Sequence, residues 1–144
     1  MIAGKLGMSI HRNKALYRQC IDRCNAHDFD GLGEFVTEDV RANEESLGLE
    51  RYIQGLADVA AAFPDYHWRL DHLLAEGDWI CARFTDSGTH RGTFLGVAPT
   101  GRSVSTFELA VYRLVDGKIA EVWVTVDNRA IIRQLTDGNQ PGSA

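Results

Sequence analysis

The apolar residues of this chain change their spacing near the middle, and that change constrains the fold more than any other feature. From residue 16 to residue 63 they recur every three or four positions, which predicts two long helices with a shorter one between them. From residue 66 to residue 127 the period becomes two, which predicts strands. Helices first and strands afterwards indicate an α+β fold, with the N-terminal helices on one face of a curved antiparallel sheet.

Capping residues set the expected limits of the helices. Asn13 and Asp28 are candidate N-caps of the first long helix and of the short helix that follows it. Pro64 stops the second long helix, because proline cannot continue the helical hydrogen-bond ladder. A last helix is expected over residues 129–135, with Asp127 placed to cap its first amides.

Turn residues mark the ends of the expected strands, and Asp116-Gly117 is the clearest hairpin signal among them. Strands are expected over residues 66–75, 79–87, 102–115 and 118–127. Which residues face one another across the Asp116-Gly117 hairpin depends on whether its loop has two residues or a bulged three. We expect an N-terminal extension over residues 1–12, a single domain over residues 13–136 and a disordered tail over residues 137–144.

Size and composition exclude several classes of protein. The chain has 144 residues, 44% of them hydrophobic, enough for one domain with a core and one internal cavity. A net charge of −5 argues against a nucleic-acid binder, which needs a clustered basic face. Cys20, Cys24 and Cys81 form neither a disulfide framework nor a metal-ligand pattern, so no metal is expected. With no signal peptide and no long apolar run, we expect a cytoplasmic protein that contacts no membrane.

The Gly-rich segment at residues 88–102, GTHRGTFLGVAPTGR, is the most specific motif in the chain. It resembles the GTHxGxFxGxxPTGR signature of SnoaL-like polyketide cyclases and ester cyclases. Further segments are similar to the same family and occur in its order, at residues 25–30, 62–65, 112–119 and 121–123. With Asp127 they extend the resemblance over nearly the whole chain, from about residue 13 to residue 135.

The resemblance implies a cone-shaped α+β fold, a cystatin-like roll shared with ketosteroid isomerase and nuclear transport factor proteins, with an apolar pocket between helices and sheet. It also implies catalysis without a cofactor. A carboxylate removes a proton alpha to a carbonyl, and the enolate attacks a second carbonyl in an aldol ring closure. Such chemistry needs an acid–base group of raised pKa, which an apolar pocket supplies by desolvation, and a donor for the oxyanion.

The acid–base residues of the family are absent from the positions that the resemblance gives them. A His or Asp is implied on the strand before the Asp-Gly hairpin and an Asp on the next strand, but these positions hold Ala110 and Val124. Glu108 is the candidate replacement, because side chains alternate along a strand and Glu108 shares one face with Ala110 and Tyr112. If that face lines the pocket, Glu108 is the catalytic base and Tyr112 a hydrogen-bond donor. The alternative is a solvated Glu108 at a strand end.

Further polar residues are candidates for ligand binding, each with a structural alternative. Asn43 could bind a carbonyl through its amide, or could only stabilise a turn. If they point inward, His72 could shuttle a proton and Arg83 could hold an enolate; otherwise both lie on the exposed sheet face. His90 could donate to a ligand or could fix the Gly-rich loop.

The outer face of the sheet is expected to stay apolar on two neighbouring strands, where Leu109 alternates with Val111 and Trp123 with Thr125. An exposed apolar patch of this kind usually marks an interface. Because the resemblance also implies dimers, we expect a homodimer through this face.

Functions of different classes remain open on the sequence. The first is a cofactor-free polyketide cyclase or isomerase that binds a small apolar carbonyl compound and removes a proton through Glu108. The alternative is a non-catalytic ligand-binding or accessory protein of the same fold, which Ala110 and Val124 favour. A cofactor-free hydroxylase of related fold is a third.

Overall fold

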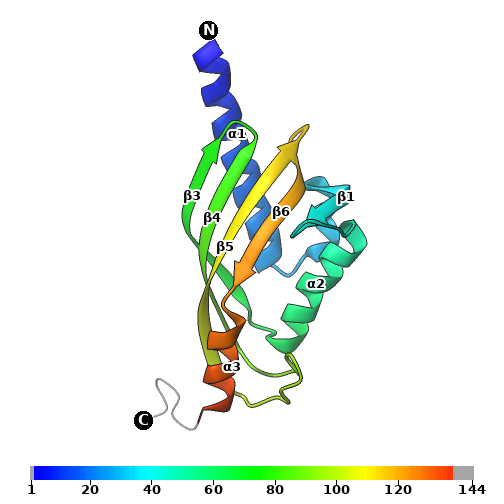
Figure 1. Cartoon of the computed structure of the whole chain (residues 1–144), viewed down its shortest axis with the longest axis vertical. Helices are drawn as coiled ribbons and strands as arrows, with labels where there is room; N and C mark the ends of the chain where they lie inside the picture. The colour runs from blue at the N-terminus through cyan, green and yellow to red at the C-terminus, as the bar shows by residue number, and fades with distance from the viewer. Residues whose placement is uncertain (1, 138–144) are drawn as a thin grey trace.

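The computed structural model describes residues 2–137, with side chains from residue 10 onward, and shows helices packed on one face of a single sheet (Figure 1). The helices are α1 (Ile2–Asn25), the 3-10 helix η1 (Phe29–Glu34), α2 (Leu49–Ala62) and α3 (Asn128–Thr136). The strands are β1 (Val36–Ala42), β2 (Glu45–Ser46), β3 (His67–Glu76), β4 (Trp79–Thr89), β5 (Ser103–Val115) and β6 (Lys118–Val126). The predicted α+β class is confirmed. Apart from Asp137, the tail expected over residues 137–144 lies outside the described residues.

The sheet has six strands in the order β2-β1-β6-β5-β4-β3, so the chain returns to place its last strand beside its first. Neighbouring strands from β3 to β6 are antiparallel, as the alternation and the turns predict. β1 and β6 run parallel, however, so the sheet is mixed and the expectation of a wholly antiparallel sheet is wrong. Parallel strands are not joined by a hairpin, and local turn residues therefore carry no signal for this pair.

Helix α1 starts well before its expected cap. It begins at Ile2, so residues 2–12 of the expected extension are helical, and its N-terminal end projects past the sheet (Figure 1). Asn13 lies inside the helix, where its side-chain amide donates a 3.2 Å hydrogen bond to the carbonyl oxygen of Gly77 in the β3–β4 turn. The N-cap expected at Asn13 is wrong, because the helix already begins at Ile2 and the amide of Asn13 makes a tertiary contact instead. Asp28 makes no capping hydrogen bond either, and pairs with Arg23 at 3.7 Å.

Two other expected helix limits are confirmed. The carboxylate of Asp127 caps α3 by accepting a 3.0 Å hydrogen bond from the amide of Ala130. α2 ends at Ala62, shortly before Pro64.

The loop between β4 and β5, which carries the Gly-rich motif, is fastened to the end of α2. The amides of Arg91 and Gly92 both donate to the carbonyl oxygen of Ala62, at 2.9 and 3.0 Å. A Cβ atom at Gly92 would lie 2.5 Å from the carbonyl oxygen of Ala61, so only glycine permits this close approach. The loop is thereby held against α2, with Phe94 over the core.

The β5–β6 hairpin combines a tight turn with a bulge. Asp116 and Gly117 both have positive φ, 51° and 77°, as a two-residue type I′ turn requires. The register then shifts, since Leu114 pairs with Ile119 but Arg113 pairs with Glu121. The extra residue in β6 changes the parity of the pairing beyond the bulge. As a result, the even-numbered residues of β5 and those of β6 from Val122 onward face the same side, and Ala110 lies opposite Val124.

The inner face of the sheet carries the core. Tyr17 of α1, Phe63 beyond α2 and Phe84 of β4 are among its fully buried side chains. The core is not filled throughout, because a cavity remains between α2 and strands β5 and β6.

Candidate functional site

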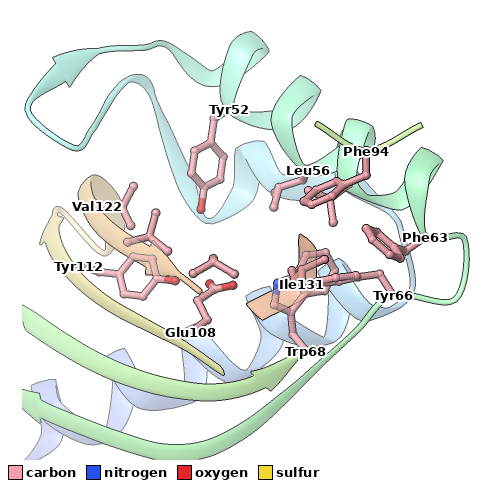
Figure 2. A pocket seen from close by; sticks show the side chains of 13 residues that line it. Tyr52, Leu56, Phe63, Tyr66, Trp68, Phe94, Glu108, Tyr112, Val122 and Ile131 are labelled. Carbon is pink, nitrogen blue, oxygen red and sulfur yellow. The ribbon is translucent and has the colours of Figure 1, made fainter. Parts of the chain in front are cut away.

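A pocket of about 190 Å³ lies between α2 and the inner face of the sheet, with further wall residues from α3 and the β4–β5 loop (Figure 2). The wall is largely aliphatic along β6 and aromatic on β3 and the loop. No lysine, arginine or histidine of the described residues lines it. Its polar and aromatic residues include Tyr52, Tyr66, Trp68, Phe94, Glu108 and Tyr112.

Glu108 places a carboxyl group in the wall of this pocket. The residue is only 8% exposed, and the carboxyl points into the cavity on the side of Tyr112 (Figure 2). Burial raises the pKa of Glu108 to about 10, and the neighbouring Asp86 acts in the same direction. The carboxyl therefore keeps its proton at neutral pH. Of the two placements considered for Glu108, the structure shows the buried one.

Asp86 on β4 is a second buried acid, which the sequence analysis did not single out. It is 1% exposed, and its Oδ2 accepts a 2.8 Å hydrogen bond from the hydroxyl of Tyr66. Burial raises the pKa of Asp86, while interactions with Glu108 and Tyr66 lower it by stabilising the carboxylate. The sequence contains a signal for Asp86, because Asp86 lies an even number of positions from Ile80 and Phe84 on the same strand. Its side chain therefore points to the same, inward face.

Buried tyrosine hydroxyls supply neutral hydrogen-bond donors. Tyr17 donates a 2.7 Å hydrogen bond to the hydroxyl oxygen of Tyr112, which leaves the proton of Tyr112 free to donate in turn. Burial raises the pKa of Tyr112 and of Tyr52 well above the ordinary value. Figure 2 shows the hydroxyl of Tyr52 directed from α2 into the pocket. These phenols stay protonated and can only donate or accept hydrogen bonds at neutral pH.

Ala110 and Val124 face the interior, where the resemblance implied an acid–base pair. They lie opposite each other on β5 and β6, and Val124 lines the pocket. Ala110 is buried but does not contribute to the pocket wall. The carboxyl group on this wall therefore comes from Glu108 and not from the two implied positions.

His90 is fully buried and fixes the Gly-rich loop. Its Nδ1 accepts a 3.1 Å hydrogen bond from the amide of Thr100 and lies 3.0 Å from the hydroxyl oxygen of the same residue. The ring packs against Phe63 at a centroid distance of 5.4 Å. His90 does not line the pocket, so the geometry corresponds to the structural alternative.

His72 and Arg83 lie on the outer face of the sheet, which is the structural alternative considered for them, and neither lines the pocket. The two residues pair with each other across β3 and β4, and both are exposed. Arg83 makes a 3.6 Å ion pair with Asp71 on that face. For Arg83 the reason is strand alternation, because the inward residues of β4 are the even-numbered ones. For His72 the reason is the register shift between Leu70 and His72 in β3, which turns His72 outward although Trp68 faces inward.

Asn43 stabilises a turn, which is the structural alternative considered for it, and it does not line the pocket between α2 and the sheet. It is exposed in the β1–β2 turn, with a positive φ of 48°. Its Oδ1 accepts a 2.9 Å hydrogen bond from the main-chain amide of Val124. The main-chain amide of Asn43 donates to the carbonyl oxygen of Val122. Asparagine tolerates this left-handed conformation better than most residues.

Two absences can be stated for the described part of the chain. No group of three or more His, Cys, Asp or Glu side chains is placed to hold a metal ion. None of the helices over residues 2–137 is long and apolar enough to cross a membrane.

An internal apolar pocket between helices and a curved sheet defines a class of small α+β proteins, and comparison with known proteins identifies the family. Residues 14–135 match the family described as SnoaL-like polyketide cyclase. The aklanonic acid methyl ester cyclase AcmA of Streptomyces galilaeus is 40% identical over 129 residues, covering 84% of this chain and 88% of the relative. The nogalonic acid methyl ester cyclase of Streptomyces nogalater is 33% identical over 92 residues, covering 62% and 68% of the two chains.

A solved structure supports the same conclusion. A SnoaL-like polyketide cyclase from Agrobacterium tumefaciens superimposes with a TM-score of 0.77 at 31% identity, covering 85% of this chain and 97% of that one. The chain therefore belongs to the SnoaL-like polyketide cyclase family.

Proposed function

We propose that this protein binds an uncharged apolar carbonyl compound in the pocket and catalyses a cofactor-free cyclase or isomerase reaction, with Glu108 as the acid–base group. The observation that carries this proposal is the buried carboxyl of Glu108 on the wall of an otherwise apolar pocket. Perturbed carboxyl groups of this kind are typical of proton-transfer sites.

The pocket wall favours an uncharged ligand. It presents hydroxyl groups, one indole and a protonated carboxyl, with no cation among its residues to balance a ligand carboxylate. Its volume of about 190 Å³ is below the ~300 Å³ at the low end of ordinary ligand pockets. We therefore expect it to enclose the reacting part of a larger polyketide. The methyl esters named for AcmA and its nogalonic acid relative have no free carboxylate at the esterified position and are suitable first substrates.

The proposed reaction conserves all protons within the site. In its ionised form, Glu108 takes the proton alpha to a carbonyl of the ligand, and the enolate oxygen accepts a hydrogen bond from the hydroxyl of Tyr112. The enolate carbon then bonds to a second carbonyl carbon of the same molecule. The resulting alkoxide takes the proton back from Glu108, so the product is an isomer of the substrate and the enzyme is unchanged.

This proposal is tested by incubating the protein with the methyl esters of aklanonic and nogalonic acids. We expect a ring-closed isomer of unchanged mass, resolved by chromatography and identified by NMR. Glu108→Gln keeps the size of the side chain and removes the proton transfer, so turnover falls about 10²–10⁴-fold. Undiminished turnover by Glu108→Gln would contradict the assignment of Glu108.

A ligand-binding protein without catalysis is the second candidate, because Ala110 and Val124 cannot transfer protons. Trp68 lines the pocket, so quenching of its fluorescence reports binding whether or not chemistry follows. Saturable quenching without ring closure, even at high protein concentration, would favour this second candidate over the enzyme.

We also propose that the protein forms a homodimer through the outer face of the sheet. Leu109 and Val111 of β5 are 42% and 37% exposed, and Trp79 stacks on Trp123 with ring centroids 5.7 Å apart on the same face. Apolar groups exposed together on two or more strands are typical of interfaces. Light scattering should give twice the monomer mass for the natural sequence and the monomer mass for Leu109→Glu. A monomeric natural protein would contradict this proposal.

A further inference from the structure

We propose that Asp86 is a positioning residue that shares one proton with Glu108, so that Glu108 can act first as a base and then as an acid. This inference rests on the proposed role of Glu108 and names the group that makes both roles possible. Nothing in the resemblance or in the comparisons assigns a function to Asp86.

The two carboxyl groups are neighbours on one buried face of the sheet. Asp86 pairs with Thr106 and Glu108 pairs with Phe84, which makes the two acids diagonal neighbours across β4 and β5. The residues are 1% and 8% exposed. Only Glu108 lines the pocket, so Asp86 lies behind it and does not contact a ligand.

Of the two carboxylate oxygens of Asp86, one accepts a hydrogen bond and the other does not. Its Oδ2 accepts the 2.8 Å hydrogen bond from Tyr66. Within the described part of the chain, Oδ1 is buried and has no hydrogen bond of ordinary geometry. An unsatisfied buried carboxylate oxygen is costly, and the acidic proton of Glu108 is the donor suited to it.

The surroundings hold the pair at one proton. Two adjacent carboxyl groups in a buried and largely apolar site cannot both ionise, because burial and mutual repulsion oppose the second charge. The groups that act on Glu108 besides Asp86 are the thiol of Cys24 from α1 and the indole of Trp68 from β3. Tyr66, Asp71 and His67, all on or next to β3, act on Asp86. Tyr52 and Tyr112, which line the pocket with Glu108, remain neutral.

The shared proton removes a difficulty of the proposed reaction. A carboxyl that keeps its proton at neutral pH cannot accept another one. If the proton of Glu108 passes to Oδ1 of Asp86, Glu108 becomes the carboxylate that takes the α-proton of the ligand. The pair then holds two protons until the alkoxide of the product takes one from Glu108, after which the remaining proton is again shared.

The test is a titration of the full chain carrying ¹³C-carboxyl Asp and Glu, followed by NMR without any ligand. In the natural sequence we expect the Asp86 and Glu108 signals each to respond at both of two common pH steps, as coupled groups do. In Asp86→Asn the Glu108 midpoint should fall by about one pH unit or more, because the neighbouring charge is gone. Asp39→Asn, which removes an exposed carboxylate from β1, serves as the matched control and should leave the midpoint unchanged.

Independent single-step titrations of the two acids in the natural sequence would overturn the inference, whether or not Asp86→Asn folds. An unchanged Glu108 midpoint in folded Asp86→Asn would also overturn it. Coupled titration in a protein that closes no ring and exchanges no α-proton would support the shared proton and refute the proposed function. Ring closure that needs Glu108, together with uncoupled titrations, would refute only the role of Asp86.

Discussion

The hydroxyl of Tyr17 on α1 donates a 2.7 Å hydrogen bond to the hydroxyl of Tyr112 on β5, and both residues are almost completely buried. The direction of this bond matters, because an oxygen that already accepts one proton presents its own proton elsewhere. Figure 2 places the Tyr112 hydroxyl next to the Glu108 carboxyl in the pocket. Tyr17 of α1 thus orients the hydroxyl of Tyr112 on β5, at the place where the proposed reaction would form an oxyanion.

Tyr112→Phe should therefore lower kcat/KM by about 10²–10³, the usual effect of removing one oxyanion donor. Tyr17→Phe should cost about tenfold or less, because it removes only a neutral hydrogen bond to the donor. Steady-state kinetics on the active ester substrate measure both. Equal losses in the two variants would show that the tyrosines act only through packing.

The raised pKa of Glu108 predicts that stability falls as pH rises. Unfolded, the carboxyl releases its proton near pH 4.5, whereas in the folded protein the pKa is about 10. Folding therefore binds a proton between these values, and its stabilising effect, complete below about pH 4.5, is lost as pH approaches 10. The free energy of unfolding should decline by up to about 1.4 kcal/mol per pH unit over this window.

Glu108→Gln should flatten that decline, since the amide does not titrate. Urea unfolding at several pH values between about 5 and 9 measures the slope. Glu45→Gln, at an exposed carboxylate of β2, is the control and should keep the slope of the natural sequence. The same slope in Glu108→Gln and in the natural sequence would contradict the raised pKa of Glu108 as the cause of the decline.

His90→Leu should loosen the Gly-rich loop. The amide of Thr100 would lose its buried acceptor, at a cost of about 1–3 kcal/mol of unfolding free energy. Ligand affinity should fall as well, because the same loop carries Phe94 to the pocket. His72→Leu makes the same change at an exposed site and should stay within about 0.5 kcal/mol of the natural sequence. Similar losses in both variants would contradict the role given to His90.

Two glycine substitutions should have opposite effects. At Gly92 a Cβ atom would meet the carbonyl oxygen of Ala61 at 2.5 Å, so Gly92→Ala should destabilise the fold by about 1–3 kcal/mol. A Cβ at Gly55 in α2 meets nothing within 4 Å, so Gly55→Ala should stabilise it by about 0.5–1 kcal/mol through helix propensity. Thermal unfolding compares the two, and a stabilised Gly92→Ala would show that the loop does not need this close approach.

Local patterns were sufficient to predict much of this molecule from its sequence. The change in the spacing of apolar residues distinguished helices from strands. The alternation of side chains along β5 placed Glu108 on the same face as Ala110 and Tyr112. Both are short-range regularities, and the structure confirms them. The same rule, applied to β4, would have excluded Arg83 and pointed to Asp86.

The errors concern contacts between segments far apart in the chain. Asn13 was expected to cap a helix, but its amide is used by Gly77 in a distant turn. The parallel pairing of β1 with β6 also depends on tertiary packing. So does the bulge that aligns Ala110 with Val124, a pairing that the sequence leaves open. Capping and turn preferences amount to about 1 kcal/mol, and tertiary contacts of this kind can override them.

The most direct test of proton abstraction by Glu108 is hydrogen exchange at the acidic carbon of a bound ester in D₂O, followed by NMR and mass spectrometry. This measurement detects proton abstraction even when ring closure is slow. We expect deuterium incorporation catalysed by the natural sequence and by Asp39→Asn, and its loss in Glu108→Gln. Saturable binding of the ester with no exchange above background, or exchange that persists in Glu108→Gln, would contradict proton abstraction by Glu108.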